Sequence, residues 1–425
     1  MKIELAPQPP KGEQNNYMFD SEQKTNNFHN SSPLGRLGGA GIYIHIPFCK
    51  QACHYCDFHF STSMKKKEEM VLALAKELQL RKSEFENESV ATIYFGGGTP
   101  SRLTIADLQL LIASIYAQYT IVEKPEITLE ANPDDLSESY LSDLKTIGVN
   151  RLSIGIQSFF EDDLKLMNRA HNSVEAKKCL EIATRYFDNI SLDLIYGIPD
   201  LSQNGEQAKQ MSNERWQQNI ETALSFGIPH ISSYALTVEP KTALNKLIQT
   251  GKIASPNDEV AQEHFMILVE TLEKNGFVHY ELSNFGKENY FSQNNSAYWL
   301  GKKYIGIGPS AHSYDGISRS WNVANNALYL KALQNDELPN EVEKLTLEDR
   351  YNEYIMTGLR TIWGVSLVRI DQDFGIDFLN YLKKQSQKFI DDGLLSITDD
   401  ILKPTLKGKF LTDGIASDLF YLNLE

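Results

Sequence analysis

The sequence predicts an α/β fold, namely an open, parallel (β/α)6 partial barrel followed by a mainly helical C-terminal domain. Six runs with the apolar, β-branched character of strands alternate with stretches of helical periodicity, which is typical of repeated β/α units. The runs read as almost continuously apolar, as expected of parallel strands covered on both faces. Polar residues end the runs, and in barrels of this kind the site lies at the C-terminal strand ends.

These patterns place the expected elements along the chain. The strands are expected at residues 42–46, 92–95, 126–130, 151–156, 190–195 and 230–235. The helices between them are expected at about 66–86, 104–118, 135–147, 161–186 and 214–227. A further helix is expected at about 257–275, before a segment rich in glycine and aromatic residues at 304–313.

The chain divides into four expected parts. Residues 1–38 are rich in Asn, Gln, Ser, Pro and Gly and bury too little apolar surface to offset their ordering entropy, so we expect a disordered tail. Residues 39–250 form the expected barrel core, and 251–335 form an extension with Gly- and aromatic-rich loops. Residues 336–425 form the helical C-terminal domain, in which 394–412 could add a small β-wing, as in a winged helix.

Charge and cysteine use limit the function and the compartment. The formal net charge of −15 disfavours a non-specific grip on nucleic acid, so we expect no nucleic-acid partner. No run of about 18 apolar residues could span a membrane, and residues 1–12 lack the apolar core of a signal peptide. Thiols without an export signal indicate a reducing compartment, so we expect a cytoplasmic protein.

Three of the four cysteines lie close together, at Cys49, Cys53 and Cys56. Thiolates at this C-x3-C-x2-C spacing can bind three irons of a 4Fe–4S cluster and leave the fourth iron open to a small chelating molecule. Structural zinc, with His45 or His54 as the fourth ligand, is an alternative, although zinc sites usually draw on two separated pairs of ligands. A disulfide framework ranks last in a chain of this length.

Polar groups end the later strands. Gly96-Gly-Gly98 follows the second strand, and successive glycines let a ligand approach the backbone and leave its N–H and C=O groups free. Glu130 ends the third strand, and its carboxylate could pair with an amine or with ribose hydroxyls. Gln157 ends the fourth strand, Arg169 follows beyond a short helix, and Asp193 lies in the fifth strand. Each alone fits an ordinary structural hydrogen bond, but together they form the pattern of a binding site.

The chain resembles the radical S-adenosylmethionine superfamily through the three cysteines and Gly96-Gly-Gly98. Within it, Tyr43-Ile-His-Ile-Pro-Phe-Cys49, Tyr94-Phe-Gly-Gly-Gly-Thr-Pro100 and Asp193-Leu-Ile-Tyr-Gly-Ile-Pro199 are similar to the oxygen-independent coproporphyrinogen III oxidase family, over roughly residues 41–420. The resemblance implies that the open iron binds S-adenosylmethionine, which the reduced cluster cleaves to a 5′-deoxyadenosyl radical. By motif, it assigns the binding of S-adenosylmethionine to Tyr43, Gly97, Gly98, Thr99, Glu130, Gln157, Arg169, Asp193 and Ala235.

That family has two branches, and the chain differs from the oxidase branch in two places. The oxidases decarboxylate the propionates of coproporphyrinogen and carry a further cysteine two positions after the third ligand, where this chain has Phe58. They also carry a long substrate-binding segment before the cluster, where this chain has a low-complexity tail. Both differences make the chain resemble the other branch, the HemW heme chaperones, which bind heme and pass it to acceptor proteins.

A His-Asn-x-x-Tyr motif is implicated in heme binding in the HemW branch, and the chain departs from it at one position. Asn295 and Tyr298 match, whereas Asn294 replaces the histidine. An asparagine amide is a poor axial ligand for heme iron, while tyrosine and histidine serve. Tyr298, or His312 if the loops converge, could take that role.

The resemblance therefore implies a heme chaperone with a 4Fe–4S cluster, S-adenosylmethionine and heme as its cofactors. Heme-acceptor proteins and an electron donor to the cluster are the expected partners. The alternative is an oxygen-independent coproporphyrinogen III oxidase of porphyrin biosynthesis, so the sequence leaves open whether the chain is an enzyme. It also leaves open the oligomeric state, with a homodimer as one option.

Overall fold

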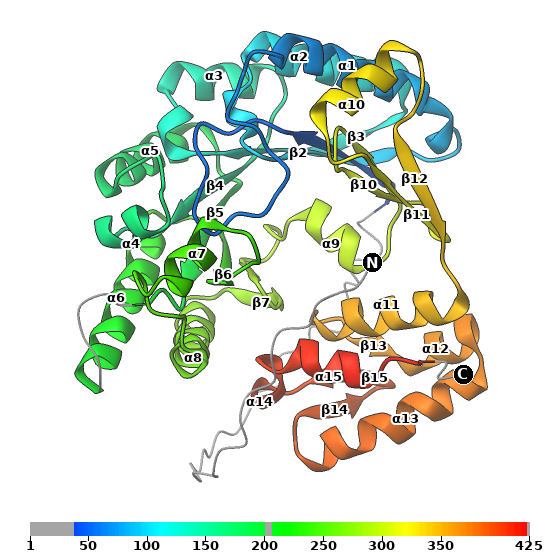
Figure 1. Cartoon of the computed structure of the whole chain (residues 1–425). Helices are drawn as coiled ribbons and strands as arrows, with labels where there is room; N and C mark the ends of the chain where they lie inside the picture. Colours follow the sequence, from blue (N-terminus) through cyan, green and yellow to red (C-terminus); the bar gives the residue numbers. More distant parts are fainter. Residues whose placement is uncertain (1–37, 200–205, 423–425) are drawn as a thin grey trace.

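One large sheet organises the described part of the chain. The computed structural model describes residues 38–199 and 206–422, so nearly all of the tail expected at 1–38 lies outside the described residues. The strands form a twelve-stranded sheet, in the order β12-β11-β10-β9-β1-β2-β3-β4-β5-β6-β8-β7, and a separate three-stranded sheet (Figure 1). Strand β1 therefore has parallel partners on both sides, although it comes first in the chain.

The predicted (β/α)6 partial barrel is confirmed. Strands β1 to β6 pair in parallel with their neighbours, and they cover Ala40–Ile46, Val90–Gly97, Ile121–Ala131, Arg151–Gln157, Ile190–Tyr196 and His230–Ala235. Helices on the outside of the sheet connect them (Figure 1), namely α1 Lys67–Leu80, α2 Ile105–Gln118, α3 Glu138–Thr146, α4 Glu161–Leu166, α5 Ser173–Tyr186 and α6 Glu206–Ser225.

The strands are buried over most of their length, but apolar and polar side chains alternate along them, which the sequence interpretation missed. Outward residues such as Ile93 and Leu152 belong to the main hydrophobic core. Their inward neighbours Thr92, Arg151 and Ser153 are polar and equally buried. Because successive side chains of a strand point to opposite faces, the helices cover an apolar face while the barrel interior collects polar groups.

The single helix expected at 161–186 is two helices with a break between them. Asn168 adopts a positive φ of 55°, a conformation that asparagine tolerates better than most residues. Asn172 then caps α5, because its side chain accepts a hydrogen bond from the Glu175 backbone. The break leaves Arg169 on a short connection at the C-terminal ends of the strands, facing the barrel interior.

The segment after β6 adds helices and extends both edges of the sheet. Where the sequence predicted Gly- and aromatic-rich loops, β9 pairs in parallel with β1, and β10 to β12 continue from it antiparallel. At the other edge, β8 pairs antiparallel with β6. These elements are α7 Ala243–Gln249, α8 Asp258–Lys274, β7 Val278–Glu281, β8 Asn284–Gly286, α9 Gln293–Trp299, β9 Tyr304–Ile307, β10 His312–Tyr314, β11 Ser318–Asn322, α10 Asn326–Gln334 and β12 Asn340–Lys344.

Helix α9 lies against the N-terminal ends of β2 and β3. The backbone N–H groups of Gln293 and Asn294 donate to the Glu126 carboxylate at 3.1 and 3.0 Å, an arrangement favoured by the positive end of the helix dipole. The Thr92 hydroxyl donates to Asn294 Oδ1 at 2.9 Å. Helix α9 therefore occupies the end of the barrel opposite to the strand ends that carry the predicted site.

The C-terminal unit has a hydrophobic core of its own, which includes Tyr351, Ile355 and Leu382. It consists of α11 Leu347–Leu359, β13 Val365–Ser366, α12 Leu367–Phe374, α13 Ile376–Asp391, β14 Leu395–Thr398, β15 Ile401–Pro404, α14 Leu406–Lys409 and α15 Thr412–Asp418. Strands β14 and β15 form the expected β-wing, joined by Asp399 and Asp400, both with positive φ. Because β12 still pairs with the large sheet, we propose that this unit begins after β12 rather than at residue 336.

Within the described residues, no helix has the length and apolar character needed to cross a membrane.

Candidate functional site

The three-cysteine loop follows β1 and is fastened to the rest of the barrel by hydrogen bonds. The Cys49 backbone N–H donates to the Ser61 carbonyl at 3.0 Å. The His54 backbone N–H and ring Nδ1 donate to the carbonyls of Met167 and Leu166, at 3.0 and 2.8 Å. The end of α4 therefore holds the loop at the C-terminal ends of the strands.

The three cysteines line one cavity of about 720 Å³. The Arg169 guanidinium reaches the same loop, with Nη1 3.3 Å from Cys53 Sγ, while Nη2 donates to Asn132 Oδ1 at 2.8 Å. Burial raises the pKa of Cys56 to about 11, so a thiolate at this position needs a nearby positive charge.

These thiols fit an iron–sulfur cluster. Soft thiolate ligands suit such clusters, and each cysteine of a cubane binds a different iron, so the sulfurs need not converge on one ion. In residues 38–199 and 206–422, no three His, Cys, Asp or Glu side chains are grouped to hold a single metal ion.

The glycines at the end of β2 serve close packing, and this corrects the expectation that the N–H groups of Gly97 and Gly98 are free for a ligand. A Cβ on Gly97, whose φ is +102°, would lie 2.4 Å from His45 Nδ1, and one on Gly98 would lie 2.7 Å from the Ile46 carbonyl oxygen. The Gly97 N–H donates to Glu130 Oε2 at 3.2 Å, and the Gly98 N–H donates to the Ile46 carbonyl at 2.9 Å. The glycines thus let the start of the cluster loop rest on β2.

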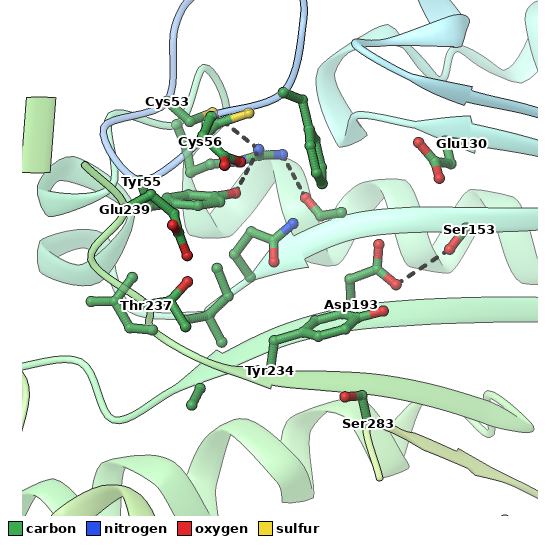
Figure 2. Close-up of a pocket in the computed structure, with 18 of the residues that line it drawn as sticks. Cys53, Tyr55, Cys56, Glu130, Ser153, Asp193, Tyr234, Thr237, Glu239 and Ser283 are labelled. Atoms are coloured by element: carbon green, nitrogen blue, oxygen red, sulfur yellow. Dashed lines mark hydrogen bonds between the residues drawn. The ribbon is translucent and has the colours of Figure 1, made fainter. Parts of the chain in front are cut away.

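Two carboxylates, one from β3 and one from β5, face the cavity beyond the cysteines (Figure 2). Glu130 accepts a hydrogen bond from the Tyr94 hydroxyl at 2.7 Å, and Asp193 accepts one from the Ser153 hydroxyl at 3.2 Å. Burial is the main cause that raises the pKa of Glu130 to about 7 and that of Asp193 to about 6. A cationic ligand would favour the ionised form of both groups, and S-adenosylmethionine carries an amine and a sulfonium.

Eight of the nine residues expected to bind S-adenosylmethionine line the cavity, and Tyr43 is the exception. Its ring stacks on Tyr94 with centroids 6.0 Å apart, so it supports the tyrosine that holds Glu130. Gln157 adopts a positive φ of 68° at the end of β4, a strained conformation that is often found at functional sites. Ala235 lines the cavity at the end of β6.

Sequence reasoning did not single out several cavity residues. Tyr234 is the next-to-last residue of β6 and lines the cavity, where it is 45% exposed. Its position near a strand end is the signal that could have identified it. Arg360, Lys409 and Asp413 line the same cavity from the C-terminal unit. Nothing in their local sequence indicates this position, because it depends on how that unit packs against the barrel.

The structure places the expected heme residues in different surroundings. Asn294 is 2% exposed and bonded to Thr92, so it faces the barrel interior. Tyr298 packs edge-on against Tyr304, with ring centroids 4.5 Å apart, and the Asn295 N–H donates to the Ser292 hydroxyl. His312 is exposed and lines a different hollow, together with Trp321 and Leu328.

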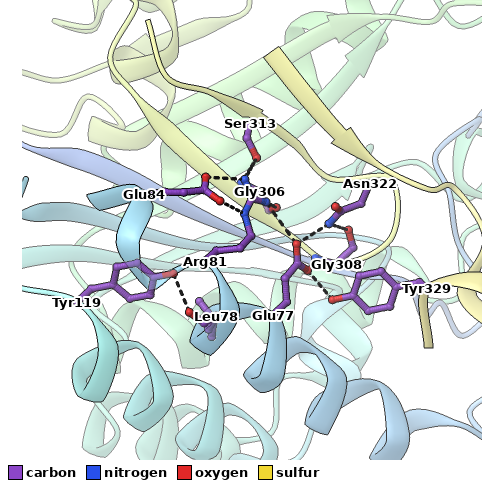
Figure 3. A network of polar contacts seen from close by, with 10 residues as sticks. All are labelled: Glu77, Leu78, Arg81, Glu84, Tyr119, Gly306, Gly308, Ser313, Asn322 and Tyr329. Carbon is purple, nitrogen blue, oxygen red and sulfur yellow. Dashed lines mark hydrogen bonds and ion pairs between the residues drawn. The ribbon is translucent and has the colours of Figure 1, made fainter. Parts of the chain in front are cut away.

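A buried polar network explains why His312 stays apart (Figure 3). Arg81, in the residue after α1, donates to the Gly306 carbonyl and the Ser313 hydroxyl at 2.8 and 3.0 Å. Glu77 is fully buried and accepts hydrogen bonds from the Tyr329 hydroxyl, the Asn322 amide and the Gly308 N–H. The network connects β9, β10 and β11 to α1, so His312, the neighbour of Ser313, lies on a strand that is held against α1.

Comparison with known proteins agrees with this site. Residues 43–211 match the model of the radical SAM superfamily, and 345–411 match the HemN C-terminal domain. The heme chaperone HemW of Bacillus subtilis is 35% identical over 381 residues, which cover 88% of this chain and 97% of that protein. The chain belongs to the HemW family of radical SAM proteins. A second HemW relative, from Lactococcus lactis, is 33% identical over 88% of this chain and 97% of its own length.

A solved structure shows the same fold as this HemW family member. Coproporphyrinogen III oxidase (HemN) from Escherichia coli, described as a radical SAM enzyme, superposes with a TM-score of 0.76 at 22% sequence identity. The superposition covers 90% of this chain and 91% of the oxidase. At that identity the likeness shows the fold alone, so the choice between a chaperone and an oxidase depends on other observations.

Proposed function

We propose that the protein is a heme chaperone, which binds heme and passes it to acceptor proteins. The observation that carries this proposal is the 35% identity to a curated heme chaperone over nearly the full length of both chains. The residue two positions after Cys56 supports it, because Phe58 stands where the oxidase branch carries a further cysteine. Its ring is 66% exposed and lines the cavity beside the cluster loop.

We also propose that the protein holds a 4Fe–4S cluster and S-adenosylmethionine in this cavity. Cys49, Cys53 and Cys56 would bind the cluster, which supplies one-electron chemistry once an electron donor reduces it. Glu130 and Asp193 would hold the cationic parts of S-adenosylmethionine.

Heme titration of anaerobically reconstituted protein tests the chaperone function. We expect a saturable shift of the Soret absorbance with a defined stoichiometry, followed by transfer of the heme to an apo-acceptor protein. Bovine serum albumin, which binds heme without being a chaperone, serves as the control for non-specific transfer. Absence of a saturable shift would contradict heme binding, and retention of heme in the presence of acceptor would contradict the transfer function.

The same preparation tests the oxidase alternative, which the shared HemN fold keeps open. Coproporphyrinogen III, a reductant and S-adenosylmethionine are supplied under anaerobic conditions, and the products are separated by chromatography. We expect no protoporphyrinogen. Its formation with multiple turnovers would replace the chaperone proposal by an oxidase.

A further inference from the structure

The cations that line the cavity differ in what balances their charge. Within the described residues these cations are Arg169, Arg360 and Lys409. Arg169 is directed at the cluster loop. Arg360 pairs with Asp413 at 2.5 Å and with Glu281 at 3.5 Å. Lys409 has no carboxylate of the described chain within 4.0 Å of its Nζ, so it forms no ion pair there, and the Glu273 carboxylate acts on it only from a greater distance.

A neutral histidine holds the Lys409 ammonium in place. Lys409 Nζ donates to His279 Nδ1 at 3.0 Å, and His279 Nε2 donates to the Leu282 carbonyl at 3.1 Å. His279 stacks on Phe285 with ring centroids 4.1 Å apart, and burial lowers its pKa to about 3. The ring therefore orients the ammonium without neutralising it, and the ammonium keeps further donors for a ligand.

Apolar side chains line the cavity together with Lys409. Phe265, Leu282 and Phe410 line the same part of the cavity, and the rings of Phe265 and Phe410 lie 5.7 Å apart. A half-buried ammonium without an anion is unfavourable, and a ligand carboxylate would relieve that cost. An apolar wall with one unpaired cation matches a ligand that combines a large apolar body with a carboxylate. Heme has this composition, because its macrocycle is apolar and its propionates are anionic.

We propose that Lys409 binds a propionate carboxylate of heme, with the macrocycle lying toward Phe265 and Phe410. Heme would then enter the cavity from the side of the C-terminal unit, and the cluster loop would lie at the opposite wall. This assignment rests on the proposed heme-binding function and adds to it the group that recognises the ligand.

A pairing of protein variants with ligand variants tests the assignment. Heme and heme dimethyl ester, which lacks free carboxylates, are titrated into the wild-type protein, Lys409→Gln and Lys409→Arg. We expect the wild type to bind heme roughly ten- to hundredfold more tightly than the ester, as for a hydrogen bond to a charged group. Lys409→Gln should bind both ligands with the weaker affinity, and Lys409→Arg should keep most of the preference for heme.

Lys407→Gln is the matched control, because Lys407 is exposed on the same helix and its Nζ donates to the Asp392 carbonyl. It should behave as the wild type. S-adenosylmethionine also carries a carboxylate, so its affinity is measured in every variant and should not change.

Three results would overturn the assignment in distinguishable ways. If Lys409→Gln still binds heme more tightly than the ester by the same factor as the wild type, another group binds the propionate. A loss of S-adenosylmethionine affinity in that variant, with heme affinity unchanged, would assign Lys409 to the other carboxylate. A wild-type protein that binds neither heme nor its ester would overturn the proposed function and, with it, this assignment.

Discussion

The two walls of the cavity are built in different ways. The cluster wall comes from one sheet, in which β1 to β6 bring the cysteine loop, Glu130 and Asp193 to the same edge. The opposite wall comes from the C-terminal unit, which has its own hydrophobic core and contributes Arg360 and Lys409, and from Phe265 of α8 and Leu282 after β7. Two independently packed bodies therefore meet at one cavity, and changes on one wall should leave ligand binding at the other largely intact.

The largest expected effect follows from removing a cluster ligand. Cys53→Ala should lose most of the iron and the iron–sulfur absorbance, because two thiolates do not hold the cluster. Iron content per chain and the absorbance spectrum measure this. Cys179→Ala is the control, since Cys179 is buried in α5 among core residues and should keep both signals. Full iron content in Cys53→Ala would contradict the cluster assignment. If the walls are independent, Cys53→Ala should still distinguish heme from its ester.

The second-largest expected effect is the pH dependence of S-adenosylmethionine affinity, which we attribute to Glu130. The pKa of Glu130 is raised to about 7, so the carboxyl becomes protonated as the pH falls through that value and no longer attracts a cation. We expect the affinity of the cluster-loaded protein for S-adenosylmethionine to fall about tenfold between about pH 8 and about pH 6. Glu130→Gln should bind weakly at both values. Isothermal titration across this range gives the profile.

Tyr94→Phe sharpens the pH test. The Tyr94 hydroxyl donates to Glu130 and lowers the pKa of that carboxyl, against the larger effect of burial. Its removal should move the midpoint of the affinity profile to higher pH while the profile keeps its shape. A profile with the same midpoint in Tyr94→Phe would exclude Glu130 as the titrating group.

A substitution that disturbs the packing between the cluster loop and β2 should reduce stability moderately. In Gly98→Ala, the new methyl group would lie 2.7 Å from the carbonyl oxygens of Ile46 and Phe48, so the loop must shift. We expect a loss of about 1–3 kcal/mol in the free energy of unfolding and lower cluster occupancy. Gly414→Ala, where no atom lies within 4 Å of the added Cβ, is the control and should be neutral or stabilise α15 by up to about 1 kcal/mol. Equal denaturation midpoints in the two variants would contradict this explanation.

The smallest expected effect is on stability, from a substitution in the buried polar network outside the cavity. Tyr329→Phe removes one donor to the buried Glu77 carboxylate, which keeps Asn322 and Gly308 as partners. We expect a loss of about 1–2 kcal/mol in stability and unchanged affinity for S-adenosylmethionine and for heme. Urea denaturation and the two titrations check this. A large change in either affinity would show that the network connects to the cavity.

The heme motif shows where sequence reasoning stopped. Asn295 and Tyr298 match the motif in the sequence, and their helix α9 packs against the N-terminal parts of β2 and β3. His312, the possible substitute, lies on a strand that the network around Arg81 holds against α1. The positions of α9 and of His312 both depend on packing between segments far apart in the chain. No local sequence pattern predicts such packing.

The sequence alone determined the cluster wall. Parallel strands end at one edge of a sheet, so residues at successive strand ends must come together wherever the β/α alternation is recognised. Local motifs were therefore enough to find Cys49, Glu130 and Asp193. The tertiary structure decided the opposite wall, because the contact between His279 and Lys409 joins residues 130 positions apart, one on β7 and the other on α14. Such a contact depends on how two folded parts of the chain pack together, so it cannot be predicted from the spacing of residues along the sequence.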